Sequence, residues 1–253
     1  MDKRIGMQYY TIRDFCQTLE DFDASCKKVS EIGYKLIQLS GTGNFEAKDI
    51  KKVLDKYGLS VVCTHRPPQN YVKNLAGEIE FHKTIGAKIC GIGRMPDISA
   101  KREDIANFAN TFRPIVEELK KNDLIFGYHN HAYEFAKTDG KHVFDIMHEE
   151  MASDNFKFIL DVYWLACAGI DPAKFIRKHG DKIACVHFKD LKIVGNTPCY
   201  AKVGEGNLEW DEIIAACEAV DIPFALVEQD ECDDDPFACI KESYQFLKNK
   251  GFE

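Results

Sequence analysis

The sequence predicts a (β/α)8 TIM barrel that forms a single domain over residues 1–253. Short apolar runs alternate with longer amphipathic stretches at a spacing of roughly 30 residues, the pattern of repeated strand–helix units around a parallel sheet. Eight such units fit the 253 residues of the chain, and no Pro-, Gly- or Ser-rich linker divides it. A doubly wound sheet is disfavoured because the first strand-to-helix turn lacks GxGxxG and no Walker loop follows any strand.

Eight apolar runs are the predicted strands, and each concentrates its polar residues at its C-terminal end. In chain order they are residues 5–10, 34–40, 59–65, 87–93, 124–131, 156–164, 183–189 and 224–230. In such a barrel the active site is built from the C-terminal ends of the strands and the loops that follow them. We therefore look for functional residues at the polar ends of these runs.

Helices are predicted between the strands, where apolar residues recur at three- and four-residue spacing. Residues 19–33 and 103–122 are two examples. Gly33, Gly58 and Gly86 follow three of these stretches and are predicted to cap their C-terminal ends. The last helix is predicted to begin at Pro236 and to close the barrel.

Composition and charge exclude several classes of protein. Hydrophobic residues make up 45% of the chain and charged residues 29%, a balance typical of folded rather than disordered chains. The net charge of -8 comes from 41 acidic and 33 basic residues, so we expect no nucleic-acid partner. No stretch approaches the roughly 18 apolar residues of a membrane-spanning helix, and the N-terminus has no signal-peptide core. We therefore expect a cytoplasmic protein without a membrane partner.

The ten cysteines are scattered in apolar runs, and none forms a CxxC pair. Cys90 in AKICGIG and Cys185 in KIACVHF are typical of them. We interpret them as small buried hydrophobic residues in a reducing compartment, not as disulfide partners, thiolate nucleophiles or zinc ligands.

Nine charged or imidazole side chains stand at predicted strand ends and are candidates for chemistry. They are His65, Arg94, His129, His131, Glu134, Asp161, His187, Lys189 and Glu228. Glu134, Asp161, His187 and Glu228 come from units five to eight, whose ends converge at one mouth of a closed barrel. Three carboxylates brought close together need a positive charge among them, which one divalent metal ion would supply. Oxygen and nitrogen ligands without thiolate suit manganese as the first candidate, with magnesium, cobalt or zinc as alternatives. For each residue alone, the simpler interpretation is a helix N-cap or a structural histidine.

Six segments of the chain resemble a known family. They are MQYYTIRD near the start, then YHNHAYEF, LDVYW, VHFKD, VGEGNLEW and VEQD. Their order and spacing resemble the xylose isomerase-like barrel superfamily, in its sugar phosphate isomerase/epimerase branch, from the first strand to the last helix. The resemblance implies a metal held by Asp161, His187 and Glu228, with a fourth ligand from strand five.

Strand five offers two candidates for that fourth ligand. Many relatives carry Glu-Asn-His where this chain has His129, Asn130 and His131. Either His129 occupies the ligand position, or Glu134, five residues later, reaches back to the ion. We favour Glu134.

Side-chain alternation along a strand adds catalytic candidates. His129 and His131 point to the same side, as do His187 and Lys189, so both members of each pair face the mouth if one does. Lys189 beside a metal would bind a substrate oxygen or stabilise an enolate. The simpler alternative for Lys189 is a salt bridge to a loop acid such as Asp190.

Four further residues are candidate substrate contacts. His65, Arg94 and Glu205 lie where strands three, four and seven release their loops. Their alternatives are a capping or packing role for His65 and a surface charge for Arg94 and Glu205. Trp164, with Tyr163, would line a sugar pocket, since aromatic rings suit the apolar face of a pyranose, although such residues also serve packing.

These residues predict an enzyme that removes a proton next to a carbonyl. The metal would bind adjacent carbonyl and hydroxyl oxygens of a sugar and stabilise the resulting enediolate. A carboxylate such as Glu228, or His129, would be the base, and His131 and Lys189 complete the catalytic candidates. Return of the proton to the same carbon gives an epimerase, and return to the neighbouring carbon gives an isomerase. The expected partner is a small-molecule sugar or keto-sugar. No Gly-rich phosphate cradle is found, which is compatible with an unphosphorylated substrate and leaves a phosphorylated one as the alternative.

Three alternatives share the barrel. The same enolate can expel a group from the β carbon, which gives a lyase of keto-inositols or 3-keto-glycosides; similar chains with histidine-rich fifth strands include such enzymes. An abasic-site endonuclease would need a trinuclear, histidine-richer site and a basic groove, which the net charge disfavours. A sugar-binding barrel without metal would bind no ion and exchange no substrate proton. Acidic relatives often form homo-oligomers, but no stretch identifies an interface.

Overall fold

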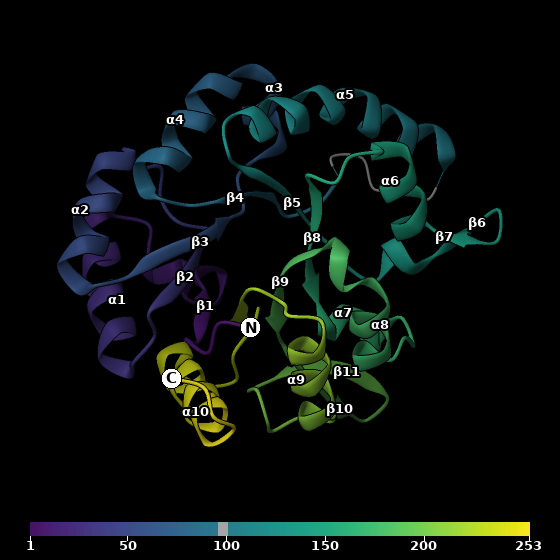
Figure 1. Ribbon diagram of the computed structural model, residues 1–253. Helices are drawn as coiled ribbons and strands as arrows, with labels where there is room; N and C mark the ends of the chain where they lie inside the picture. Colours follow the sequence, from purple (N-terminus) through teal and green to yellow (C-terminus); the bar gives the residue numbers. More distant parts are fainter. Residues whose placement is uncertain (96–100) are drawn as a thin grey trace.

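The predicted strands close into a barrel. The computed structural model describes residues 1–95 and 101–253, and within them eight parallel strands pair around the ring in the order β1-β12-β9-β8-β5-β4-β3-β2 (Figure 1). The barrel strands are β1 (Gly6–Gln8), β2 (Leu36–Leu39), β3 (Ser60–Thr64), β4 (Ile89–Ile92), β5 (Ile125–His129), β8 (Phe156–Asp161), β9 (Ile183–Phe188) and β12 (Ala225–Val227). Each lies inside a predicted run, so the predicted TIM barrel is confirmed.

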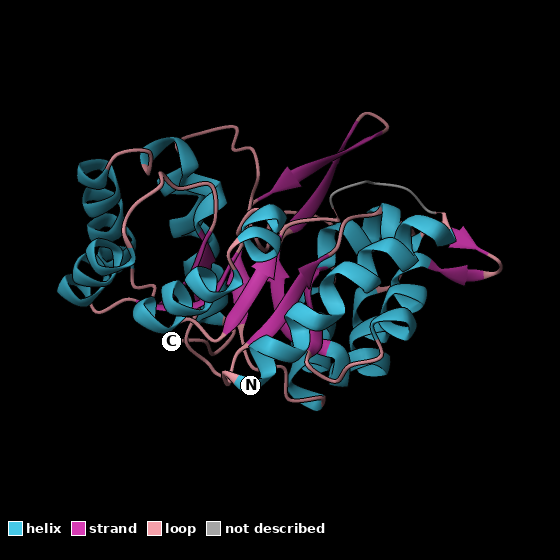
Figure 2. Cartoon of the chain, turned by 90° about the horizontal axis from the view of Figure 1, so that it is seen from above, coloured by secondary structure: helices cyan, strands magenta, loops and turns pink. Residues whose placement is uncertain are grey.

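Helices surround the barrel and cover its outer face (Figures 1 and 2). They are α1 (Leu19–Ile32), α2 (Ala47–Tyr57), α3 (Pro68–Lys73), α4 (Leu75–Ile85), α5 (Arg102–Lys121), α6 (Val143–Met151), α7 (Val162–Cys167), α8 (Pro172–His179), α9 (Trp210–Ala219) and α10 (Pro236–Asn249). Short 3-10 turns are η1 (Tyr9–Phe15), η2 (Tyr133–Phe135) and η3 (Gly180–Lys182). Helices α1 and α5 match the two predicted examples to within a residue or two, and α10 begins at the predicted Pro236.

The ends of α1 show why the sequence forms this helix. Thr18 accepts a hydrogen bond from the backbone N–H of Asp21 and so caps the N-terminus. The C-terminal cap is Gly33, with a φ of 125° that side chains rarely adopt. A Cβ atom there would lie 2.4 Å from the hydroxyl oxygen of Tyr244 on α10, so glycine also permits close helix packing. Gly58 and Gly86 end α2 and α4 in the left-handed conformation, as predicted.

The interior of the barrel is apolar at its lower level and polar at its mouth. The lower level is one compact cluster of buried side chains: Leu36, Val62, Cys63, Ile89, Ile159, Ala184, Cys185 and Leu226. Because side chains alternate along a strand, the inward residues two positions further on form the next level, for example Gln38, Asp161 and His187. The functional level is therefore supported from below by a packed core.

Two β-hairpins were not predicted. One joins β10 (Asp190–Val194) to β11 (Thr197–Ala201), and the smaller joins β6 (Lys137–Thr138) to β7 (Lys141–His142). Figure 2 shows both projecting from the body of the barrel. Their strands are partly exposed and lack the continuous apolar runs of the barrel strands, which is why a search for buried strands misses them.

Two further predictions concern the state of the cysteines and membrane-spanning helices, in the part of the chain that the structure describes. All ten cysteines are free there, and Cys63, Cys90 and Cys185 are among the buried ones. No helix in residues 1–95 or 101–253 is both long and apolar enough to cross a bilayer.

Candidate metal centre and active site

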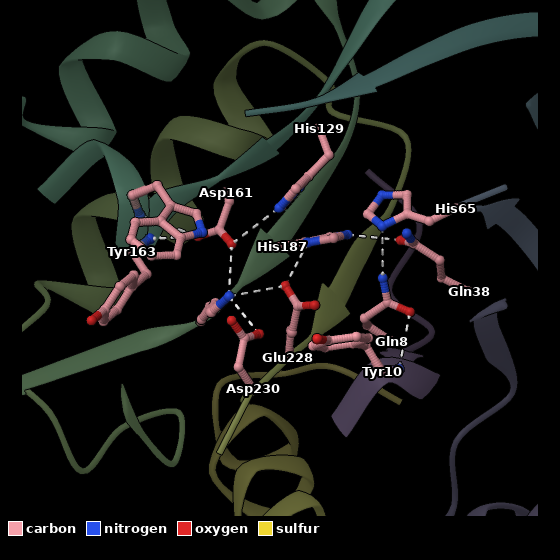
Figure 3. A network of polar contacts seen from close by, with 12 residues as sticks. Gln8, Tyr10, Gln38, His65, His129, Asp161, Tyr163, His187, Glu228 and Asp230 are labelled. Atoms are coloured by element: carbon pink, nitrogen blue, oxygen red, sulfur yellow. Dashed lines mark hydrogen bonds and ion pairs between the residues drawn. The ribbon is translucent and has the colours of Figure 1, made fainter. Parts of the chain in front are cut away.

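Four potential ligands converge at the C-terminal mouth of the barrel. His129 ends β5, Asp161 ends β8, His187 lies in β9 and Glu228 follows β12 (Figure 3). Each offers one ligand atom, and these atoms all lie within 4.8 Å of one another. All four side chains are buried.

Asp161 serves two functions with its two carboxylate oxygens. Oδ1 caps α7, accepting hydrogen bonds from the backbone N–H groups of Tyr163 at 2.8 Å and Trp164 at 3.3 Å. Oδ2 is buried, lies 3.9 Å from Nε2 of His129, and has no hydrogen-bond partner among the described residues. The helix-cap interpretation and the ligand interpretation are therefore compatible, because they use different oxygens.

His187 is held from both sides. Its Nδ1 lies 2.8 Å from Oε2 of Glu228, and its Nε2 lies 2.7 Å from Oε1 of Gln38. Burial alone would lower the pKa of His187, but the Glu228 carboxylate outweighs burial and raises it. Burial alone would likewise raise the pKa of Glu228, but Lys189 and His187 hold it below its usual range. Nδ1 of His187 is therefore directed toward the other candidate ligands.

Lys189 is a buried cation in the middle of the site. Its ammonium lies 2.7 Å from Oδ1 of Asp230, 3.4 Å from Oε2 of Glu228 and 3.4 Å from Oδ2 of Asp161. The rings of Tyr163, Trp164 and Tyr200 lie 5.1–5.6 Å from the ammonium nitrogen. Burial alone would lower the pKa of Lys189, but the three carboxylates outweigh it, so the pKa is raised and the side chain stays charged.

The alternative pairing of Lys189 with Asp190 does not form. Asp190 instead accepts hydrogen bonds from the backbone N–H groups of Gly204 and Gly206 and from the indole N–H of Trp210. It therefore organises the loop that precedes α9, while Lys189 faces the mouth together with His187, as side-chain alternation predicts.

The charges and donors of the cluster fit a divalent cation. Asp161, Glu228 and Asp230 bring three carboxylates to one buried ammonium, which leaves an excess of negative charge. Burial, partly opposed by Lys189, raises the pKa of Asp161 to about 7, which shows how poorly this carboxylate is compensated. Two imidazole and two carboxylate ligands suit a borderline to hard divalent ion. Oδ2 of Asp161 makes no hydrogen bond with the described residues and lies 3.4 Å from the Lys189 ammonium. Together these features support a metal position.

The structure does not bring Glu134 into this group. Its carboxylate accepts hydrogen bonds from the hydroxyl of Tyr128 at 2.6 Å and from the backbone N–H of His131 at 2.7 Å. Burial raises the pKa of Glu134 to about 7. Of the two candidates from strand five, His129 is the one that lies with Asp161, His187 and Glu228, and Glu134 supports the turn that carries His131.

His131 and His65 extend the cluster toward solvent. The ring of His131 stacks on Tyr133, with centroids 5.6 Å apart, and lies 5.3 Å from the Trp164 ring. Burial and then Lys189 lower the pKa of His131 to about 4, so its imidazole is neutral at pH 7. The His65 ring lies 5.0 Å from His129 and, with His129 and His187, forms a second, overlapping set of possible ligands.

A cavity of about 410 Å³ opens directly above the cluster. Its lining is Tyr10, Ser40, His65, Gly93, Arg94, His129, His131, Lys189, Glu228 and Asp230. Of the predicted substrate contacts, His65 and Arg94 line this cavity. Trp164 is not among the lining residues, and its ring centre lies 5.3 Å from the Lys189 ammonium. Glu205 does not line it, and forms an ion pair with Lys202 at 3.3 Å.

Four lining residues were not predicted from the sequence: Gly93, and three that carry side chains. Tyr10, Ser40 and Asp230 each stand two positions beyond an inward residue of the barrel, namely Gln8, Gln38 and Glu228. The alternation of side chains that predicts a common direction for His187 and Lys189 would also predict these three residues, if it is continued beyond the end of every strand.

A second cavity, of about 610 Å³, adjoins the first on the side of β2, β3 and β4. The two cavities share Ser40, His65, Gly93 and Arg94. Gly91, at the base of this shared wall, has no room for a side chain, because a Cβ atom would lie 2.1 Å from the carbonyl oxygen of Thr64. The backbone is therefore closely packed where the two cavities meet.

The closed parallel barrel with a polar cluster at its C-terminal mouth places the protein in the class of TIM barrels that carry a site at this end. A sequence model described as xylose isomerase-like TIM barrel matches residues 26–250, and the chain belongs to this family. No curated protein matches the sequence significantly.

Solved structures show the same fold. A sugar phosphate isomerase/epimerase from Parabacteroides distasonis ATCC 8503 is 24% identical, with a TM-score of 0.78 over 97% of both chains. The probable 3-DHS dehydratase from Bacillus anthracis is 15% identical, with a TM-score of 0.75 over 98% of this chain and 99% of that one. A structure described as L-ribulose 3-epimerase is 15% identical, with a TM-score of 0.71 over 99% and 97%. At these identities the likeness concerns the fold.

Proposed function

We propose that this protein is a divalent-metal-dependent isomerase or epimerase of a sugar or keto-sugar. The observation that carries the proposal is the buried group of His129, Asp161, His187 and Glu228. Two of its members, His129 and Glu228, line a cavity together with Lys189. The family and the names of the structural neighbours are consistent with it. The cavity suits a small molecule rather than a nucleic acid, and the acidic chain agrees.

Metal binding would use the four clustered side chains. His129, Asp161, His187 and Glu228 would hold the ion, with manganese as the first candidate and magnesium, cobalt or zinc as alternatives. When bound, such an ion acts as a Lewis acid that polarises a carbonyl oxygen. His129 and Glu228, the bases expected from the sequence, would then be metal ligands. A different residue must therefore act as the base.

His131 is the residue best placed to accept the proton. Its imidazole lines the cavity, is neutral at pH 7, and is held between Tyr133 and Trp164. Removal of the proton next to the carbonyl develops negative charge on the substrate oxygen, and the permanently charged Lys189 stabilises that charge. Proton return to the same carbon epimerises the sugar, and return to the neighbouring carbon isomerises it.

The test is metal analysis of protein purified without chelator, followed by NMR in heavy water with a panel of ketoses, keto-inositols and 3-keto-glycosides. We expect close to one equivalent of divalent metal and deuterium at the carbon next to the carbonyl. The variant His131→Gln should keep the metal and lose at least about a hundredfold in exchange rate. His142→Gln, outside the cavity, is the matched control. Metal-free protein without exchange would contradict the proposal and favour a sugar-binding barrel.

A lyase is the second candidate, and the adjoining cavity favours it. The same proton removal leads to loss of a group from the β carbon, and the second cavity gives that leaving group room. Release of water from a keto-inositol, or of an aglycone from a 3-keto-glycoside, would distinguish the lyase from the isomerase in the same NMR experiment.

A further inference from the structure

The second cavity is a built pocket with a fixed wall. It lies between the loops that follow β2, β3 and β4, and its floor includes Leu39, Ile50 and Phe81. The loop after β2 is tied to η1 and the turn after it: Gln17 Nε2 donates to the carbonyl of Gly41 at 2.7 Å, and the N–H of Gly43 donates to the carbonyl of Cys16 at 2.8 Å. This wall is therefore held in place without a ligand.

The opposite wall is fixed by an ion pair. The Arg66 guanidinium donates two hydrogen bonds to the carboxylate of Glu78, both at 3.0 Å, and lies 4.3 Å from the centre of the Phe81 ring. This bidentate contact uses the charge of Arg66 within the protein. Arg94 is exposed and has neither a hydrogen bond nor an ion pair within residues 1–95 and 101–253.

The chemistry of the lining matches a hydroxylated ring. Thr42 and Asn44 supply a hydroxyl and an amide to the lining, and Phe45 and Phe81 supply aromatic surface. A pyranose has an apolar face bordered by hydroxyl groups, so it can contact aromatic rings and donors at once. Arg94 is the one cation without an ion pair that the described lining offers, so most of the lining is uncharged.

We propose that this cavity is a subsite for a second sugar ring, so that the substrate is a glycoside of at least two sugar units rather than a free monosaccharide. The shared wall of Ser40, His65, Gly93 and Arg94 lets one ligand occupy both cavities. The assignment of the reacting ring to the cavity above the metal cluster rests on the proposed function. Binding of the second ring does not depend on it.

Calorimetry with glycosides that have no free carbonyl tests the subsite without turnover. The probes are methyl β-glucopyranoside, methyl β-cellobioside and methyl β-maltoside, each titrated into the full-length protein with manganese present. We expect at least one disaccharide glycoside to bind about tenfold more tightly than the monosaccharide glycoside, because it fills the second cavity. Equal affinities for all three probes would overturn the proposal.

A cavity-filling variant locates the effect. Asn44→Trp places a large ring at the rim of the second cavity, and Lys48→Trp places the same ring on the exposed face of α2, outside it. Asn44→Trp should abolish the roughly tenfold preference and leave the affinity for the monosaccharide glycoside within about twofold, whereas Lys48→Trp should change neither. Equal weakening of all probes by Asn44→Trp would overturn the subsite. A preserved preference in a protein that shows no proton exchange would overturn only the proposed reaction.

Discussion

Gln38 fixes the orientation of the His187 imidazole: its Oε1 accepts a hydrogen bond from Nε2 of His187 at 2.7 Å. The same oxygen accepts a hydrogen bond from the thiol of Cys63 at 2.9 Å, so the Gln38 amide is itself held in place by a residue of the barrel interior. With Nε2 carrying the proton, Nδ1 of His187 is the nitrogen left for an ion, on the side of Glu228. A partner of this kind commonly orients a metal-binding histidine.

Gln38→Leu should therefore weaken metal binding by about ten- to a hundredfold, because His187 loses its orienting acceptor. Competition with a chromophoric chelator measures the change in affinity directly. Gln245→Leu, on the exposed side of α10, is the control and should bind as wild type does. Unchanged affinity in Gln38→Leu would show that the hydrogen bond serves packing alone.

The two strand-five candidates can be separated by substitution. His129→Gln should lose most of the bound metal, because it removes one of four clustered ligand atoms. Glu134→Gln should keep the metal, since both oxygens of Glu134 are used by Tyr128 and the backbone of His131. Metal content per protein, measured by elemental analysis of the two purified variants, decides between them. The reverse pattern would return the ligand position to Glu134.

The sequence predicted the barrel strands well because strands buried on both faces are continuous apolar runs between helical stretches. It placed His129, His187, Lys189 and Glu228 at the mouth for the same reason. It favoured Glu134 over His129 as the fourth ligand, whereas His129 is the one that lies with the other three, because the turn after β5 decides which side chain faces the centre. In that turn the Tyr128 hydroxyl donates a hydrogen bond to Glu134, six residues further on, and a contact of this spacing has no signature in the strand or helix periodicity.

Asp161 illustrates a second limit. A strand-end acid before a helix predicts either a cap or a ligand. The sequence offers no way to see that Oδ1 makes the cap while Oδ2 makes no hydrogen bond and lies 3.4 Å from the Lys189 ammonium. The Asp190 contacts with Gly204, Gly206 and Trp210 were missed because they join residues 14 to 20 positions apart. Such loop contacts follow from the folded path and have no period along the chain.

The folded protein is expected to lose stability in acid because of His82, a buried histidine outside the candidate site. Its Nδ1 lies 2.6 Å from the carbonyl oxygen of Glu78 and its Nε2 lies 2.8 Å from Oγ1 of Thr64, both buried. Burial lowers its pKa from 6.5 to about 4. Between these values the unfolded chain binds a proton that the folded protein does not, so stability is full above pH 6.5 and falls toward pH 4, by about 3 kcal/mol for this group.

Urea unfolding between pH 7.5 and 4.5 measures this dependence. The variant His82→Gln should be less stable at neutral pH, because its buried contacts change, but should lose less stability on acidification than wild type. The comparison of slopes isolates the histidine from the other buried groups that also titrate. Parallel slopes in the two proteins would show that His82 does not titrate in this range.

Lys189 gives the most direct test of the charge balance in the site. Its ammonium contacts Asp161, Glu228 and Asp230 and is 1% exposed. Lys189→Met keeps an unbranched side chain of nearly the same length and removes the charge. The buried carboxylates of Asp161 and Glu228 and the partly buried carboxylate of Asp230 are then left with no ammonium among them. Breaking a buried pair in this way costs about 3 kcal/mol or more, so the variant should be much less stable than wild type in the presence of chelator.

Added manganese should restore part of that loss, because a divalent ion compensates the same carboxylates. The increase in the urea midpoint on adding manganese should therefore be larger in Lys189→Met than in wild type. Lys192→Met, which removes an exposed ammonium that pairs with Asp233, is the matched control and should respond to manganese as wild type does. If manganese stabilised Lys189→Met no more than wild type, the carboxylates around Lys189 would not be the ones that bind the ion. The lysine would then balance the buried charge by itself.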